Sequence, residues 1–331
     1  MLKYILKRLG LAVIILLGVS LIIYVLIRVM PVDFIQSKVD AMNQGNTQVD
    51  QEKVDAMYEM YGLGDKSFGG LIEGYANWLL QLLQGNLGTT FKNNIPVTQI
   101  IKQYMPVSFA ISLIATVFEF MIAIPLGITA ATHQYSLRDY IVTILVMIGI
   151  SLPSFFFGNM LKDIFAYKLG WFPSMGETSA TTSDMSFFGE VQSYISHLFL
   201  PILTIVILSI GGRMRMTRTN MLEVMSSDYI RTARAKGLSE TKVIYKHAFR
   251  NTLIPVVTSL AGLLPSLFSG SIITEQVFDI QGIGKIALDY MNAGDIPFIM
   301  GYNMFLAVLS VIGVLLADLM YVIVDPRVKI E

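Results

Sequence analysis

Arg213 to Asn251 reads RMRMTRTNMLEVMSSDYIRTARAKGLSETKVIYKHAFRN, a basic and mostly polar stretch between two apolar runs. Hydrocarbon offers no hydrogen-bond partners, so a membrane protein keeps so long a polar stretch only where it meets water. We interpret the segment as a surface presented to something in an aqueous compartment, and a second protein is the interpretation that we favour.

The rest of the chain is strongly apolar. Of the 331 residues, 54% are hydrophobic and 15% are charged, whereas a soluble domain averages about 25% charged residues. The composition therefore indicates an integral membrane protein. The absence of cysteine excludes disulfides and cysteine-ligated metals, and the net charge of zero gives no reason to expect nucleic-acid binding. No metal site is expected, because the three histidines, His133, His197 and His247, lie far apart.

Six stretches approach the roughly 20 mostly apolar residues that a membrane-spanning helix needs. They predict an all-α integral membrane protein with six transmembrane helices. The fourth stretch is the weakest, because Arg213 and Arg215 follow soon after it, and we expect it to continue as a helix out of the membrane. The runs are about Leu9–Val29, Val107–Ala131, Ile141–Leu161, Leu198–Ile210, Leu253–Ile273 and Tyr302–Val324.

Basic residues predict the orientation of these spans, because cytoplasmic loops carry the excess of Lys and Arg. With the N-terminus inside, the inner segments hold most of the 24 Lys and Arg residues, and the others are spread over much longer outer loops. An even number of spans then places both termini in the cytoplasm.

The chain divides into three predicted parts. Residues 1–30 form the N-terminus and first span, residues 31–104 form a small extracytoplasmic subdomain, and residues 105–331 form a five-helix core with a cytoplasmic segment at 213–252. Within the subdomain, Val39–Tyr61 has loosely helical spacing.

A second helical stretch of the subdomain, Leu71–Leu83, places three large side chains on one face. They are Tyr75, Trp78 and Leu82. A small outer subdomain that contains this stretch could cover the mouth of the membrane core.

Two helices at an angle are predicted within the cytoplasmic segment. The first runs from Met214 to Lys236 and ends at Gly237, since glycine readily adopts the left-handed conformation that terminates helices. Ser239 offers an N-cap side chain for a second helix that runs to about Arg250.

Two explanations fit the basic cluster of this segment. One is attraction to anionic lipid headgroups, at about 1 kcal/mol for each contact. The other is docking of a short helix into a cleft on a soluble partner. Charge alone favours lipid, but the helix–glycine–helix geometry favours docking, as do the small residues Ala233 and Ala235, which permit close approach.

Two carboxylates fall inside predicted spans. Glu119 lies near the middle of the second span and Asp318 within the last one. Because a carboxylate at a helix centre costs about 2.5–3.5 kcal/mol on insertion scales, neither is expected to face lipid. Each either lines a translocation pathway or bonds to a neighbouring span, and Asp318 is the weaker pathway candidate because it lies nearer the inner end.

No catalytic machinery is evident. The sequence has no Gly-x-x-x-x-Gly-Lys-[Ser/Thr] loop for nucleotide phosphates, and the glycine-rich run Gly282–Lys285 lacks that spacing. The cytoplasmic segment shows no Ser/His/Asp arrangement and no paired carboxylates. We therefore expect no enzyme activity in this chain.

These residues resemble the membrane-spanning permease subunits of bacterial ABC importers, and in particular the B-type permeases of dipeptide and oligopeptide importers. The resemblance covers nearly the whole chain and consists of several motifs in the same order. The matching runs are Asp228–Leu238, Lys246–Asn251, Ile254–Pro255, Leu6–Leu9, Gly62–Lys66, Tyr75–Trp78, Gly85–Gly88, Glu275–Phe278, Gly282–Gly284, Asp295–Pro297 and Asp325–Arg327.

The sequence departs from the family pattern in a few places. Met30–Asp33 replaces the usual Pro-Gly-Asp-Pro, Asn86 stands where Asp is common, Gln281 stands where Pro usually precedes the glycine, and Ser67–Gly74 resembles a small insertion. These differences leave the identity of the substrate open.

The resemblance implies a type I importer fold in a bacterial inner membrane. It also implies a second homologous permease, two cytoplasmic ATPase subunits that hold ATP and Mg²⁺, and an extracytoplasmic binding protein that delivers a peptide; this chain itself would hold no cofactor. The last part of the first inner helix and the turn that follows it would dock in the ATPase cleft. The residues concerned are Asp228, Tyr229, Arg231, Ala233, Arg234, Ala235, Lys236, Gly237 and Leu238.

Three other functions stay open. The same scaffold serves importers of nickel or other small solutes. An ion-coupled secondary transporter would use Glu119 and Asp318 as ion sites, but that class needs no docking loop and usually shows internal repeats, which the sequence lacks. A membrane-embedded hydrolase is the least favoured, because no catalytic set is visible.

Overall fold

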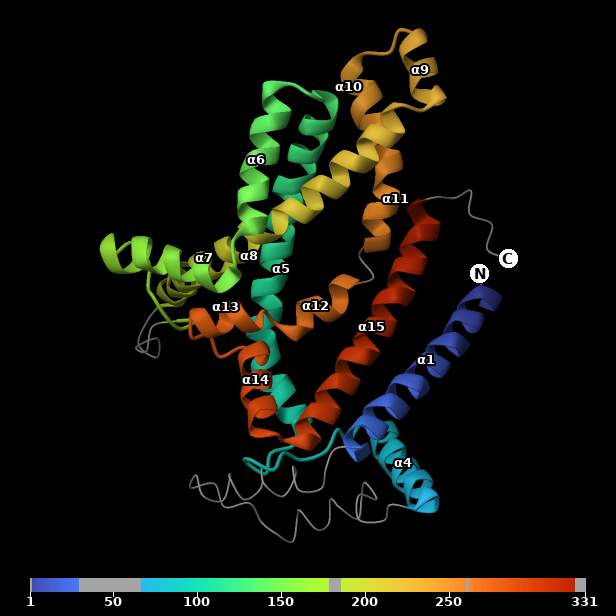
Figure 1. Ribbon diagram of the computed structural model, residues 1–331, viewed down its shortest axis with the longest axis vertical. Helices are drawn as coiled ribbons and strands as arrows, with labels where there is room; N and C mark the ends of the chain where they lie inside the picture. The colour runs from blue at the N-terminus through green and yellow to red at the C-terminus, as the bar shows by residue number, and fades with distance from the viewer. Residues whose placement is uncertain (1, 30–66, 179–185, 260–261, 325–331) are drawn as a thin grey trace. The chain divides into compact units, whose positions relative to one another are not determined.

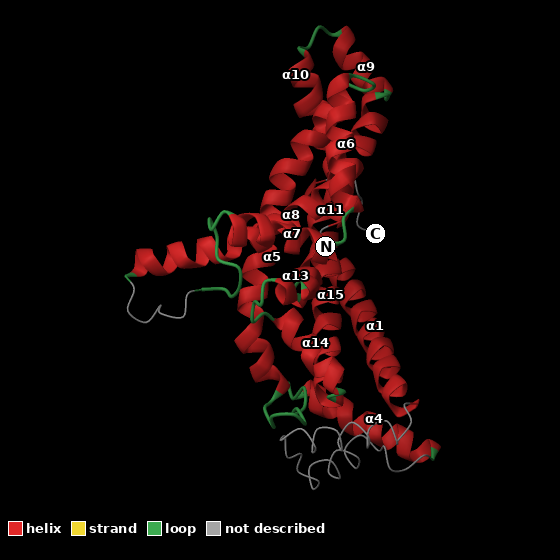
Figure 2. Ribbon diagram, turned by 60° about the vertical axis from the view of Figure 1, so that its left-hand side comes forward, coloured by secondary structure: helices red, strands yellow, loops and turns green. Residues whose placement is uncertain are grey.

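The computed structural model describes residues 2–29, 67–178, 186–259 and 262–324. All regular elements in these ranges are helices (Figure 2), which confirms the all-α prediction. The α-helices are α1 Leu2–Val29, α4 Phe68–Leu83, α5 Val97–Thr132, α6 Leu137–Ser151, α7 Ser154–Leu161, α8 Phe187–Met225, α9 Asp228–Ala235, α10 Glu240–Lys242, α11 Arg250–Ser259, α12 Leu263–Ser269, α13 Ile272–Val277, α14 Ile283–Ala293 and α15 Ile296–Val324, and two π-helical stretches are η1 Lys162–Lys168 and η3 Val243–Phe249.

Four of the described helices are long and apolar enough to cross a membrane. They contain Leu6–Ile27, Val97–Thr132, Phe187–Met225 and Ile296–Met320, and a bent pair of helices brings the number to as many as five. Four predicted runs coincide with these helices, and α8 continues beyond its apolar run as expected. The count of six spans stays a prediction.

The third predicted run, Ile141–Leu161, is not one straight helix. It forms α6 and then α7, and the bent pair turns through 101° between Leu137–Ser151 and Ser154–Lys168. Pro153 explains the break, because proline disfavours the helical conformation of the residue before it. Leu152 accordingly has extended backbone angles, with φ −85° and ψ 130°.

The fifth predicted run, Leu253–Ile273, is also divided. Its described residues lie in α11, α12 and the start of α13, while residues 260–261 are outside the described ranges. Gly270 ends α12 with φ 72°, a conformation that interrupts a helix and that glycine adopts without strain. The predicted helix Val39–Tyr61 lies outside the described residues.

The described chain forms two compact units. The described residues of the first fall within Met1–Pro106 and Gly282–Ile312, and those of the second fall within Val107–Gln281 and Gly313–Lys329. In the first unit, Tyr24 of α1 stacks on Trp78 of α4 at 6.0 Å between ring centroids, and Tyr75 bonds to Ser20 at 2.8 Å. The predicted helical stretch Leu71–Leu83 is therefore part of α4, and the face that holds Tyr75 and Trp78 packs against α1.

A buried carboxylate, Asp295, begins α15 in the first unit. One oxygen accepts a hydrogen bond from the Phe298 N–H at 3.2 Å and the other accepts one from the Lys92 N–H at 3.0 Å. Burial raises the pKa of Asp295 to about 6, and the backbone N–H groups lower it only in part. Asp295 thus fastens the loop near Lys92 to the start of α15.

We expect this carboxyl to make the stability of the chain depend on pH. Its pKa is about 6 in the folded chain and about 3.9 in an unfolded one, so the folded state binds the proton more tightly. The resulting stability is present below pH 4 and is lost as the pH rises through 6, at about 1 kcal/mol between pH 5 and pH 7. Thermal unfolding in detergent should show this loss for the natural chain and less of it for Asp295→Asn; equal pH slopes for the two chains would contradict the assignment.

Helix α8 is the central element of the second unit. At Gly127 of α5, an added Cβ atom would lie 2.7 Å from Thr217 Cβ and 2.8 Å from the Met214 carbonyl oxygen. At Gly211 of α8, it would overlap Ile150 of α6. Small residues at helix crossings let backbones approach closely within a membrane, so α8 is packed tightly against both neighbours.

Candidate functional site

The candidate docking segment, Asp228–Leu238, begins at a break in the helix that was predicted to be continuous. The predicted helix Met214–Lys236 is two helices, because α8 ends at Met225 and α9 begins at Asp228. Ser227 has extended backbone angles, and its hydroxyl donates to the Val224 carbonyl. Serine readily makes such local bonds in place of helix, and the charge of Asp228 suits the first turn of the new helix.

Helix α9 is fixed by a narrow buried face. Ile230 and Ala233 are 0% and 7% exposed and share a hydrophobic cluster with Met221 of α8, Val243 of η3 and Ile128 of α5. Ala233 therefore holds the docking segment to its own protein and contributes little to its outer surface.

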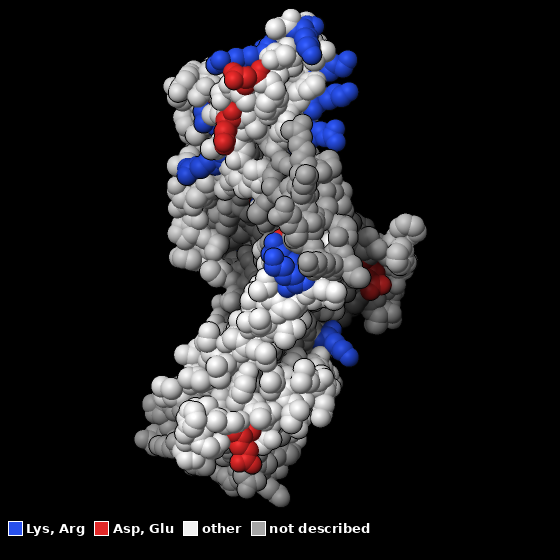
Figure 3. All heavy atoms as spheres, turned by 90° about the vertical axis from the view of Figure 1, so that its right-hand side faces the viewer, with Lys and Arg blue, Asp and Glu red and all other residues white. Residues whose placement is uncertain are grey.

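The opposite face of α9 is exposed and basic. Tyr229, Arg231, Ala235 and Lys236 are all exposed. Figure 1 places α9 and α10 side by side beyond the end of α8, and Lys and Arg side chains gather over this end of the second unit in Figure 3. A small residue amid basic and aromatic ones gives a partner room to approach closely.

Gly237 ends this helix as predicted. Its φ is 76°, its N–H donates to the Arg234 carbonyl at 2.9 Å, and the Leu238 N–H donates to the Ala233 carbonyl at 3.4 Å. This pair of bonds is the Schellman motif, which satisfies the last carbonyls of a helix. The turn is therefore a defined structure.

The second inner helix differs from its prediction. Ser239 has the extended backbone of an N-cap residue but makes no side-chain capping bond. The helix does not end near Arg250, since α10 continues through η3 into α11. Across the turn, Arg234 donates to Glu240 at 2.9 and 3.3 Å, an exposed bidentate pair that ties α9 to α10.

Glu119 has a partner on a neighbouring helix. Its carboxylate accepts a bond at 3.0 Å from Nε of Arg213 on α8, and both side chains are largely buried. The Arg213 guanidinium also donates to Ser259 on α11 at 2.9 Å and lies 4.5 Å from the centroid of the Phe120 ring. Of the two alternatives given for Glu119, a bond to a neighbouring span thus describes the geometry. A role in lining the translocation pathway stays a prediction for Glu119 and for Asp318 of α15, which is half-buried.

A second ion pair joins α6 to α8, and the sequence analysis missed it. Arg218 donates to both carboxylate oxygens of the buried Asp139, at 2.9 and 2.8 Å. Asp139 also accepts a bond from the Tyr135 N–H at 3.0 Å. The run Ser136-x-x-Asp139 is a helix-start signal, but nothing local indicates a partner 79 residues away.

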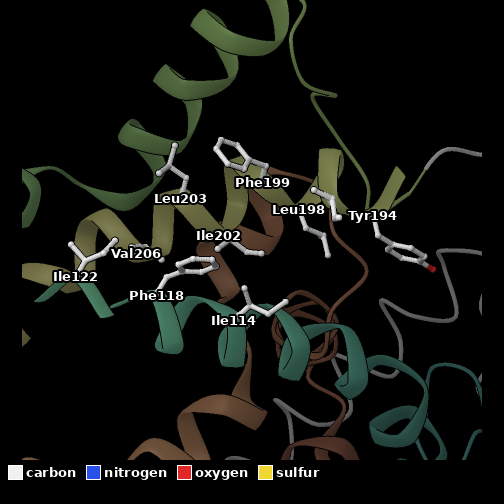
Figure 4. Close-up of a pocket in the computed structure, with 10 residues that line it drawn as sticks. Ile114, Phe118, Ile122, Tyr194, Leu198, Phe199, Ile202, Leu203 and Val206 are labelled. Atoms are coloured by element: carbon white, nitrogen blue, oxygen red, sulfur yellow. The ribbon is translucent and has the colours of Figure 1, made fainter. Parts of the chain in front are cut away.

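An apolar cavity of about 470 Å³ lies between α5 and α8. Figure 4 shows Ile114 and Phe118 of α5 facing Leu198, Ile202 and other α8 side chains across it. Peptide amides buried there would lack hydrogen-bond partners, which is costly. The cavity therefore suits hydrocarbon and does not suit a peptide backbone.

Comparisons with known proteins agree with this architecture. Residues 123–330 match the family described as "Binding-protein-dependent transport system inner membrane component". The chain is 36% identical over 330 residues to the oligopeptide transport system permease protein AppB of Bacillus subtilis (strain 168), covering 99% of this chain and 100% of that one. It is 32% identical over 332 residues to the dipeptide transport system permease protein DppB of the same organism, covering 100% and 99%.

A solved structure shares the fold. A chain of the MetNI methionine ABC transporter in an inward-facing conformation superposes with a TM-score of 0.54 at 17% identity, over 69% of this chain and 97% of that chain. At this identity the likeness concerns the fold alone.

Proposed function

Because the chain belongs to the family of binding-protein-dependent transport system inner membrane components, we propose that it forms half of the pathway of an ATP-driven importer of peptides. The chain is the membrane-spanning permease subunit of such an importer. Two full-length relatives are an oligopeptide and a dipeptide permease, which supports peptides over nickel or another small solute.

The structure of the docking segment is the observation that carries this proposal. A short helix with Ile230 buried beneath it and the Gly237 turn beyond it presents an exposed basic face. Transmission of force needs a segment that keeps its shape when a partner moves. The cluster beneath α9 and the two backbone bonds of the turn supply that rigidity.

The importer needs further subunits to work. Two ATPases would bind ATP and Mg²⁺ below the membrane, a second homologous permease would complete the pathway, and an extracytoplasmic binding protein would deliver the peptide. The excess of Lys and Arg near α9 supports a cytoplasmic location for this end, and thus cytoplasmic termini and insertion in the bacterial inner membrane.

Alternating access follows from the connections of α9. When the ATPases close on ATP, they would move α9, and the shared hydrophobic cluster would carry that movement to Met221 of α8 and Ile128 of α5. The spans would then change which side of the pathway is open. Such coupling requires contacts that differ between the two states.

This function can be tested by measuring uptake in cells whose chromosomal copy of the gene is deleted and which express the gene from a plasmid. Labelled peptides of two to five residues and radioactive nickel would be supplied separately, with and without depletion of cellular ATP. We expect ATP-dependent uptake of one or more peptides and no nickel uptake. Peptide uptake that survives ATP depletion and collapses with the proton gradient would overturn the importer assignment in favour of ion coupling.

A further inference from the structure

A second, smaller cavity lies between α6 and α8. Its volume is about 230 Å³, and its lining combines apolar with polar and charged side chains. Val146, Met147 and Met214 are the apolar ones, and the exposed polar residues Tyr140 and Arg215 form its rim. Hydrocarbon next to charged groups matches the junction between the acyl chains and the headgroup of a phospholipid.

The cavity also lies where the apolar part of α6 begins. Along α6, Ile141, Ile144 and Leu145 are 48%, 57% and 64% exposed, as side chains that face lipid are. Tyr140 precedes them and is 55% exposed. Tyrosine is enriched at membrane–water interfaces, so the rim lies at headgroup depth.

The charge of the cavity is positive. Its lining contains one carboxylate, Asp139, and two guanidinium groups, Arg215 and Arg218. The carboxylate is neutralised by its bidentate bonds to Arg218 and also accepts bonds from Tyr135 and Thr143. One positive charge is left for a ligand.

Arg215 carries that charge. It is exposed, and it has no carboxylate within ion-pair distance among the residues that the structure describes. One of its nitrogens lies 2.7 Å from the Met147 sulfur, and a thioether is only a weak acceptor. A phosphate oxygen would be a far stronger partner for this guanidinium.

We propose that this cavity binds the headgroup of an anionic phospholipid, with Arg215 pairing to the phosphate and Val146, Met147 and Met214 contacting the start of an acyl chain. Basic cavities between transmembrane helices are known sites for anionic headgroups. The site rests on the geometry of α6 and α8 and does not depend on peptide as the substrate. Its assignment to the inner leaflet rests on the proposed orientation.

Native mass spectrometry tests the site. The full chain would be purified in mild detergent with its co-purifying subunits and titrated separately with phosphatidylglycerol, phosphatidylcholine and soluble glycerol phosphate. We expect one equivalent of phosphatidylglycerol to bind, with affinity lowered about fivefold by Arg215→Gln and largely kept by Arg215→Lys. The matched control is Arg250→Gln, an exposed arginine outside both the cavity and the docking segment, which should leave binding unchanged.

Four results would overturn the proposal. They are unchanged binding in Arg215→Gln, an equal loss in Arg250→Gln, equally tight binding of phosphatidylcholine, and equally tight binding of glycerol phosphate. The last would indicate a site for soluble anions, and equal binding of phosphatidylcholine would remove the selectivity that the charge predicts.

A labelling experiment supports the test without altering Arg215. Because the chain has no cysteine, a single Tyr140→Cys variant reports on the rim, and Tyr167→Cys on η1, away from the docking segment, serves as a similarly exposed control. Phosphatidylglycerol should slow modification of the cysteine at 140 and leave the one at 167 unaffected. Equal rates of modification at position 140 with and without the lipid would contradict the site. The site would also be contradicted if an associated subunit protected this cysteine in the absence of the lipid and the lipid added no further protection.

Discussion

Gly237→Pro is expected to abolish peptide uptake while leaving the chain inserted in the membrane. Proline fixes φ near −65° and has no N–H, so it fits neither the φ of 76° nor the bond to the Arg234 carbonyl. Proline at a position with such a φ and a bonded N–H destabilises the structure by more than about 1 kcal/mol, so the turn should lose its shape and uptake should fall to the background level.

Two further variants give this experiment its controls. Gly237→Asn should keep most of the uptake, because asparagine tolerates the left-handed conformation and no other atoms lie within 4 Å of the added Cβ position. Ala235→Trp should abolish uptake by filling the space that a partner needs, without disturbing the buried face of α9. Uptake, membrane content and ATPase activity of the purified complex would be measured for each variant, and full uptake in Gly237→Pro would remove the coupling role of this turn.

Arg213→Gln is expected to destabilise the chain strongly, because it leaves the carboxylate of Glu119 without its partner in a largely buried position. Loss of one member of a buried ion pair costs about 3 kcal/mol, which lowers the Tm by roughly 5–10 °C. Removal of both charges in Glu119→Gln/Arg213→Gln should restore much of that stability. Thermal unfolding in detergent measures both effects.

The exposed pair Lys168–Asp163 is a matched control for this experiment. Its atoms are 2.6 Å apart, but both side chains are more than half exposed, so Lys168→Gln should cost no more than about 1 kcal/mol. The double variant also tests the pathway. If Glu119 carried a coupling ion, the stable double variant would lose uptake, whereas ATP-driven uptake close to the natural level would exclude that role.

The sequence was most informative where a local rule acts alone. Gly237 was predicted to end a helix because few residues adopt its conformation without strain, and α8 was expected to leave the membrane because Arg213 and Arg215 follow its apolar run. The helical stretch Leu71–Leu83 was likewise predicted from spacing alone and lies within α4.

The sequence was least informative where two signals compete or where distant residues meet. Ser226 and Ser227 lie inside a helical pattern, and nothing in that pattern indicates that their hydroxyls bond to the preceding turn and divide the helix. Pro153 alone does not indicate whether the third apolar run forms one kinked span or two separate helices. The pairs of Asp139 with Arg218 and of Glu119 with Arg213 depend on which helices are neighbours, which no local pattern gives.

The tight packing of α8 has a mechanical consequence. This helix has 39 residues, which corresponds to about 58 Å, and its crossings with α5 and α6 leave no room for a side chain at Gly127 or Gly211. Elements packed this closely resist sliding, so a tilt of α8 would carry α5 and α6 with it. The part of α8 after its internal Pro201 runs for 24 residues to Met225, which is about 36 Å. If a partner moves α9, a tilt of about 8° over this length would displace one end by about 5 Å, close to the rise of one helical turn.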